Sequence, residues 1–196
     1  GRRDPQVVMD ELDRGRLHLA CGCRLYRKQI ERGAYFLHEH PAQATSWQER
    51  DIRSVLGLPG VARIVADQCQ LGQEDEDGNP IRKPTGFMSN SEEILKSLSW
   101  RCYGRGGQCT RPEGGRHVQC RGRVAKAAAV YPRKLCRAVL KGLCAQLKKD
   151  GSLENGVFGI DTAHEKDTNR GELPEGYSGK FRDDMTQQPL RDLSLI

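Results

Sequence analysis

Regular hydrophobic spacing in this chain of 196 residues ends at Asp150. Residues 1–149 contain segments with helical or strand-like spacing, whereas residues 150–196 combine glycines and charged residues without such a pattern. Hydrophobic residues make up 36% of the chain and its mean hydropathy is −0.70, which is low for a chain that packs throughout. We therefore expect one partial α/β domain at 1–149, followed by a flexible, disordered acidic linker or tail at 150–196.

The order of the elements predicted within residues 1–149 indicates the fold class. Helical spacing runs from Pro5 to about Gly33, and further helices are predicted at 46–56, at 91–99 and after Pro132. Strands are predicted at 34–39, 61–65 and 85–88. Because strands that alternate with helices favour a mostly parallel sheet, we expect a partial Rossmann-like sheet with flanking helices. Ligands of such sheets bind at the carboxyl ends of the strands.

The segment FLHEHP (36–41) places Glu39 at the expected carboxyl end of the first strand. A carboxylate at this position can accept hydrogen bonds from a ligand and can transfer a proton. The alternative is a carboxylate that faces solvent or caps the next helix. We expect His38 and His40 to point to opposite faces of the strand, and to serve in packing or at the surface rather than as ligands of a shared metal.

Positive charge is concentrated in one block of the chain, although the net charge of the whole is only +6. Residues 99–149, the basic lobe, hold 13 Lys/Arg and one acid, a net charge of +12, whereas residues 1–98 carry −1 and residues 150–196 carry −5. Such a block attracts polyanions, so we expect DNA or RNA as a partner, the alternative being a solvated surface without one. The candidate contacts are Arg101, Arg105, Arg111, Arg116, Arg121 and Arg123.

We interpret the first residues, GRRDPQ, as no signal peptide, and on that expectation the eight cysteines predict reduced thiols or metal ligands rather than disulfides. Four candidate ligands in the Gly- and Arg-rich loop predicted at 101–123 have the spacing C-x6-C-x7-H-x2-C: Cys102, Cys109, His117 and Cys120. Three thiolates and one imidazole can hold zinc tetrahedrally, and free cysteines in a basic loop are the alternative. With no apolar run long enough to cross a membrane, we expect an intracellular protein, nuclear or cytoplasmic.

Several stretches resemble the C-terminal part of DNA cytosine-5 methyltransferases. FLHEHP (36–41) resembles the strand-end glutamate element of that family, and VADQCQLG (65–72) with IRKPTGFMSN (81–90) resembles the later part of the domain. The segment 101–117, which begins RCYGRGGQC and ends at His117, and AAAVYPRKLCRAV (127–139) are similar to the C-terminal Cys/His loop and Tyr-Pro helix of divergent members. The resemblance implies S-adenosylmethionine as the family cofactor, a cytosine contact for Glu39 and a supporting role for Arg82, which we add to the nucleic-acid-binding candidates.

The catalytic parts of that family are missing from this chain. It contains no Pro-Cys dipeptide and no Gly-rich cofactor loop, and Cys69 follows Glu39, whereas the family's nucleophile precedes its glutamate. We therefore expect Glu39 to be vestigial, and we expect neither methyl transfer nor a bound cofactor from this chain alone.

The chain as a whole, including LPEGYSGKFRDDMTQQPLRD (173–192), resembles a segment of copia-type retrotransposon polyproteins. This resemblance implies the remainder of the polyprotein as a further partner. Three functions remain open. They are a catalytically incomplete methyltransferase-like fragment associated with nucleic acid through its basic lobe, a zinc-stabilised nucleic-acid-binding module, and a non-functional remnant of a decayed mobile element.

Overall fold

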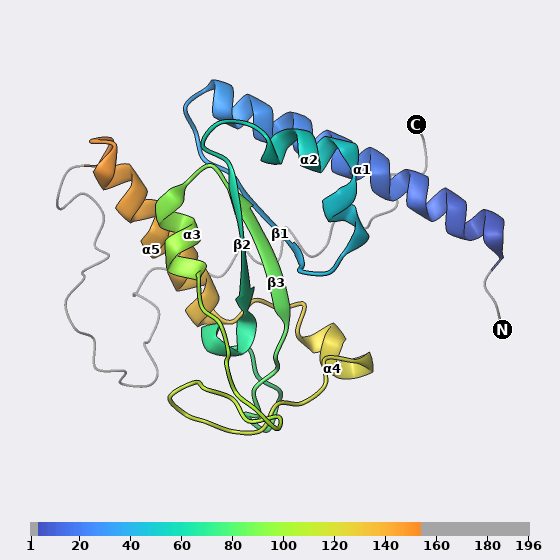
Figure 1. Ribbon diagram of the computed structural model, residues 1–196, viewed down its shortest axis with the longest axis vertical. Coiled ribbons are helices and arrows are strands. Elements are labelled where there is room, and N and C mark those ends of the chain that lie inside the picture. Colours follow the sequence, from blue (N-terminus) through green and yellow to red (C-terminus); the bar gives the residue numbers. More distant parts are fainter. Residues whose placement is uncertain (1–3, 154–196) are drawn as a thin grey trace, which may run out of the picture. The chain divides into compact units, whose positions relative to one another are not determined.

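The computed structural model describes residues 4–153, in which helices cover both faces of a three-stranded sheet (Figure 1). The strands are β1 (Leu37–Pro41), β2 (Ala62–Asp67) and β3 (Pro84–Ser89). The α-helices and 3-10 helices are α1 (Pro5–Glu31), η1 (Thr45–Gln48), α2 (Arg50–Leu56), η2 (Gln68–Leu71), α3 (Glu92–Leu98), α4 (Gly122–Ala127) and α5 (Arg133–Lys149). The tail expected at 150–196 lies outside the described residues from position 154 onward. The α/β class is confirmed.

The expected mostly parallel, Rossmann-like sheet is wrong. The strand order is β1-β3-β2, and β3 pairs antiparallel with both neighbours. β1 and β2 run parallel to each other, with α2 in the connection between them, but β3 lies between the two. Parallel neighbours need a crossover connection, and the segment 68–83 between β2 and β3 holds only a single 3-10 turn and a loop. The chain therefore returns antiparallel, and the three strands form a split β-α-β unit.

β1 continues through the polar residues that were expected to end it. Glu39 pairs with Phe87 in the middle of the strand, and His38 pairs with Met88. The expectation that His38 and His40 face opposite ways is wrong, because residues two apart on a strand share a face. Their rings stack with centroids 5.7 Å apart, and both rings contact Trp47 edge-on.

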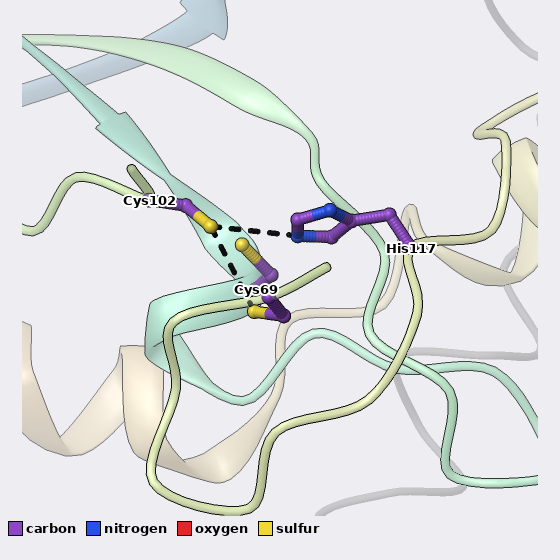
Figure 2. A group of neighbouring side chains, drawn as sticks. Cys69, Cys102 and His117 are labelled. Carbon is purple, nitrogen blue, oxygen red and sulfur yellow. Dashed lines mark hydrogen bonds between the residues drawn. The ribbon is translucent and has the colours of Figure 1, made fainter. Parts of the chain in front are cut away.

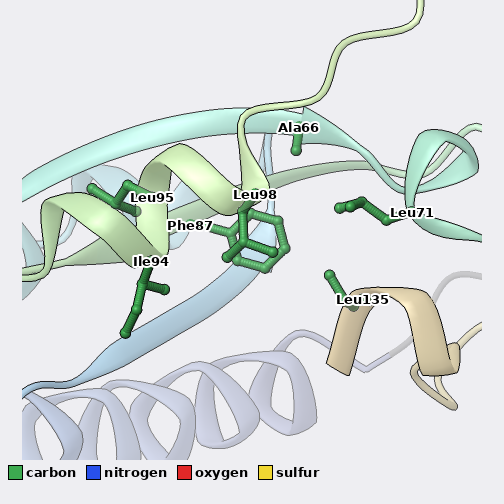
Figure 3. Packing of buried hydrophobic residues seen from close by; sticks show 7 residues of the cluster. All are labelled: Ala66, Leu71, Phe87, Ile94, Leu95, Leu98 and Leu135. Atoms are coloured by element: carbon green, nitrogen blue, oxygen red, sulfur yellow. The ribbon is translucent and has the colours of Figure 1, made fainter. Parts of the chain in front are cut away.

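Two apolar clusters, one on each face of the sheet, form the core. β3 contributes to both, because Phe87 and Met88 alternate across its pleat. One cluster lies against α3 and α5 (Figure 3) and consists of Ala66, Leu71, Phe87, Ile94, Leu95, Leu98 and Leu135. The other lies against α1 and α2 and consists of Cys23, Phe36, Trp47, Ile52, Val55 and Met88.

The predicted helix after Pro132 is confirmed as α5, which packs against α3. The contact is close because Gly142 faces α3, where a Cβ atom would lie 2.6 Å from the Cα of Ile94. Ser91 caps α3, and the neighbouring Asn90 has a different role. The Oγ of Ser91 accepts the hydrogen bond of the Ile94 N–H, while Asn90 bonds the backbone of the segment that precedes β1.

α1 begins where Asp4 accepts a hydrogen bond from the Gln6 N–H, and it has 27 residues. The helix buries only Cys23, and Leu17 and Leu25 are exposed. Its apolar stripe thus packs on the sheet only toward its C-terminal end. Within the described part of the chain, no helix combines the length and apolarity needed to cross a bilayer.

Candidate metal centre

Four soft donor side chains converge at the end of β2. The ligand atoms of Cys69, Cys102, Cys109 and His117 all lie within 4.8 Å of one another. Figure 2 shows the side chains of Cys69, Cys102 and His117 directed toward a common point. The three cysteines are buried and His117 is partly buried. Because three thiolates and one imidazole are a donor set of structural zinc sites, this group could hold a metal ion.

The donor spacing agrees with tetrahedral coordination. A tetrahedron with Zn–S bonds of about 2.3 Å and a Zn–N bond of about 2.0–2.1 Å has edges of about 3.8 Å between sulfurs and about 3.5–3.6 Å between sulfur and nitrogen. The Sγ atoms of Cys102 and Cys109 are 3.8 Å apart, and the Cys102 Sγ lies 3.5 Å from the His117 Nε2. These two distances are therefore close to those that a bound zinc ion imposes, and the remaining donor–donor distances are at most 4.8 Å.

Two segments of the chain supply these donors. Cys69 lies on η2, directly after β2, and the other three ligands lie on residues 101–121, here named the Cys/His loop. Two backbone hydrogen bonds fold this loop back on itself, from the Cys109 N–H to the Gly115 carbonyl at 2.8 Å and from the His117 N–H to the Gly107 carbonyl at 2.7 Å. This fold-back places Cys109 and His117 on the same side, facing η2.

A fully buried carboxylate attaches the Cys/His loop to the sheet. Asp67, the last residue of β2, accepts a hydrogen bond from the Cys102 N–H at 2.9 Å. The guanidinium groups of Arg82 and Arg101 pair with the same carboxylate at 3.4 and 3.2 Å. Arg82 also donates to the Cys102 carbonyl at 3.0 Å. The position of Cys102 is thus fixed from both sides of its backbone.

Hydrogen-bond donors surround the sulfur atoms. The Gln70 Nε2 donates to the Cys109 Sγ at 3.5 Å, and the Thr110 hydroxyl donates to the Cys102 Sγ at 3.5 Å. Burial alone raises the pKa of Cys102, but hydrogen bonds from Thr110 and from the Gly104 N–H outweigh it and lower that pKa to about 6. Burial, followed by the neighbouring Cys109, raises the pKa of Cys69. The lowered pKa favours the thiolate form of Cys102, and a bound cation would favour the same form for the other two cysteines.

The predicted ligand set needs one correction, because the structure brings together Cys102, Cys109 and His117 but replaces Cys120 with Cys69. Val118 is tied to the segment after η2, where its N–H donates to the Pro80 carbonyl, and the chain then leads Cys120 away from the group. Cys69 lies 33 positions before Cys102, a spacing that no local motif contains. The sequence feature that could have indicated Cys69 as a ligand is its position two residues after the end of a strand.

The candidate nucleic-acid contacts divide into two groups. Arg82 and Arg101 are held by Asp67, and Arg111 is largely buried, where it pairs with Glu74 at 2.9 Å and donates to two backbone carbonyls. These three side chains therefore have structural partners. The other four are exposed, and within residues 4–153 their guanidinium groups form no ion pair: Arg105, Arg116, Arg121 and Arg123.

Glu39 does not belong to the Cys/His group, and its hydrogen bonds go to other residues. Its Oε2 accepts a hydrogen bond from the Tyr131 hydroxyl at 2.8 Å, and its Oε1 accepts a longer one from the Gln68 Nε2 at 3.5 Å. Burial, followed by the hydrogen bond to Glu39, raises the pKa of Tyr131. These contacts link the start of α5 to the sheet. The methyltransferase role of Glu39 stays a prediction.

Comparisons of the chain with protein-family models, with curated proteins and with solved structures find no match. The resemblances to methyltransferases and to retrotransposon polyproteins therefore stay predictions as well. The geometry of the Cys/His group and the charges around it are the remaining guides to function.

Proposed function

We propose that this protein is a nucleic-acid-binding module whose Cys/His loop is folded around one zinc ion. The observation that carries the proposal is the convergence of four donors, Cys69, Cys102, Cys109 and His117, whose ligand atoms all lie within 4.8 Å of one another. Thiolate-rich sites of this kind select zinc over the harder cations magnesium and calcium. A donor set that is completed within one chain and largely buried is typical of a structural rather than a catalytic metal.

The charges around the loop support the binding role. Residues 99–149 hold a single acid, Glu113, among 13 Lys/Arg, and three of these arginines already have structural partners. The four exposed arginines lie on the Cys/His loop and at the start of α4. A guanidinium group presents a planar fork of donors that matches a phosphate group. Zinc would hold the loop, and the arginines on it and beside it would contact the phosphates.

The metal part of the proposal is tested by zinc content in the full chain. We expect about one zinc per chain after purification in zinc-containing buffer. Cys69→Ser should lose the metal, whereas Cys120→Ser should retain it, because only Cys69 belongs to the group. Inductively coupled plasma mass spectrometry gives the stoichiometry, and circular dichroism shows that both variants keep their helices. Equal zinc retention by both variants contradicts the proposed site.

The binding part is tested by a salt series with labelled nucleic acid and two matched variants. Neutralising the four exposed arginines (R105Q, R116Q, R121Q and R123Q together) should weaken binding and lower the slope of log affinity against log salt by about 3. The control removes four exposed arginines from the first half of the chain, R24Q, R32Q, R50Q and R53Q, and so changes the net charge equally. The same loss of affinity in both variants contradicts a binding surface at the loop.

A further inference from the structure

Two exposed aromatic side chains flank the first cysteine of the Cys/His loop. In the segment Trp100-Arg101-Cys102-Tyr103, Trp100 is 56% exposed and Tyr103 is 81% exposed. The other tryptophan of the chain, Trp47, is only 4% exposed. Large aromatic side chains are usually buried in at least part of their surface, so an exposed pair beside a basic loop needs a separate explanation.

Hydrogen bonds position the chain around both side chains. The indole N–H of Trp100 donates to the Ser97 carbonyl at 3.0 Å, and the Trp100 carbonyl accepts the hydrogen bond of the Asp67 N–H at 2.9 Å. The Tyr103 N–H lies 3.4 Å from the Thr110 hydroxyl, and Cys102 between the two aromatics is fixed by Asp67. The hydrogen-bonding group of Trp100 is thus satisfied within the protein, which leaves part of the ring surface for a ligand.

We propose that Trp100 and Tyr103 stack on unpaired bases, so that the ligand of the Cys/His loop is a single-stranded nucleic acid. This inference rests on the nucleic-acid-binding function proposed above and specifies its substrate. Bases of a duplex are stacked on one another and offer no free face, whereas single strands present a face at every base. Exposed aromatics among arginines are the combination that single-strand-binding surfaces use, with stacking on the bases and charge along the backbone.

The inference does not distinguish RNA from DNA, because the chemistry that both share is an unpaired base on a phosphate backbone. A protein partner that covers the two rings is a different proposal, which the basic surroundings do not favour. That partner would leave the affinity for every nucleic acid unaffected by changes at Tyr103.

The experiment measures the affinity of the full chain for four labelled 20-mers by fluorescence anisotropy: an oligo-dT, an oligo-rU, an abasic strand of equal phosphate number and a duplex. We expect both base-bearing single strands to bind at least about tenfold more tightly than the abasic strand and the duplex. Tyr103→Leu and Trp100→Leu should each weaken binding to the base-bearing single strands by about fivefold to a hundredfold. Tyr103→Phe and Trp100→Phe should bind nearly as the unchanged protein does, because a stacking face remains.

A second readout does not depend on any variant. Trp100 is exposed and Trp47 is buried, so oligo-dT should quench the fluorescence of the exposed indole and the abasic strand should not. Equal affinity for the oligo-dT and the abasic strand, or no loss of affinity in either Leu variant, overturns the stacking inference and leaves the binding module intact. Failure to bind any of the four ligands at low salt overturns the proposed function together with this inference.

Discussion

The sheet with its covering helices and the Cys/His loop are ordered in different ways. The sheet body, residues 5–98 and 133–149, buries two apolar clusters, one on each face. The Cys/His loop buries Cys102 and Cys109 beside Cys69 of η2, and otherwise relies on backbone hydrogen bonds and the contacts of Asp67. A segment rich in glycine and arginine gains little from apolar burial and loses much chain entropy on folding. Such a segment needs another source of order, which a metal ion bound by the donor group would supply.

Removal of the metal by a chelator should produce the largest difference between the two regions. If zinc holds the loop, a chelator should abolish the protection of the loop amides, including those of Cys109 and His117, from hydrogen exchange. The amides of β3 should stay protected, because the strand lies at the centre of the sheet between two apolar clusters. Exchange is followed by mass spectrometry with and without chelator. Unchanged protection of the loop contradicts a structural metal.

Truncation of the largest fully buried side chain should destabilise the sheet body instead. Phe87 is 1% exposed, so Phe87→Ala should lower the free energy of unfolding by about 3–5 kcal/mol through lost burial and a cavity. Leu17→Ala on the exposed side of α1 is the control and should cost less than about 0.5 kcal/mol. Urea unfolding of the two variants gives the comparison. Similar losses in both would mean that the cluster is not the core.

Acid should weaken the sheet body through His38. Burial, followed by the neighbouring His40, lowers the pKa of His38 to about 4. The unfolded chain has an ordinary histidine pKa of about 6.5 and binds the proton more readily between these values. The free energy of unfolding should therefore be highest above about pH 7. It should fall by about 3 kcal/mol as the pH drops to about 4.

His38→Gln should remove most of this pH dependence, whereas His18→Gln on the exposed part of α1 should leave it in place. Both are measured by urea unfolding in chelator, so that metal release at low pH does not contribute. A full pH dependence in His38→Gln would assign the acid sensitivity to other groups.

The smallest effect is expected where the two regions are joined. Asp67→Asn keeps the shape of the side chain but removes the negative charge that pairs with Arg82 and Arg101 and that strengthens the hydrogen bond from the Cys102 N–H. Groups that orient metal ligands in this way typically change affinity by about tenfold to a hundredfold. We expect a loss of zinc affinity in that range, measured by competition with a chromophoric chelator. Asp51→Asn, at an exposed position of α2, is the control with the same change of charge.

Local patterns in the sequence predict much of the secondary structure, because each depends on neighbouring residues. The helix after Pro5, the helix after Pro132 and the three strands all follow from hydrophobic spacing, and their bounds shift by only a few residues. The short helix α4 was missed, since its six residues lie in a Gly- and Arg-rich segment and bury no side chain.

The sequence by itself determined the basic block, the helices and strands, and three of the four donors in the Cys/His group, because these follow from composition and short spacing. Only the tertiary structure decided the direction of β3, the choice of Cys69 over Cys120, and which arginines are free. Each of these depends on contacts between segments far apart in the chain. Such contacts are set by the pairing of β3 between β1 and β2 and by the buried Asp67, which no local pattern reveals.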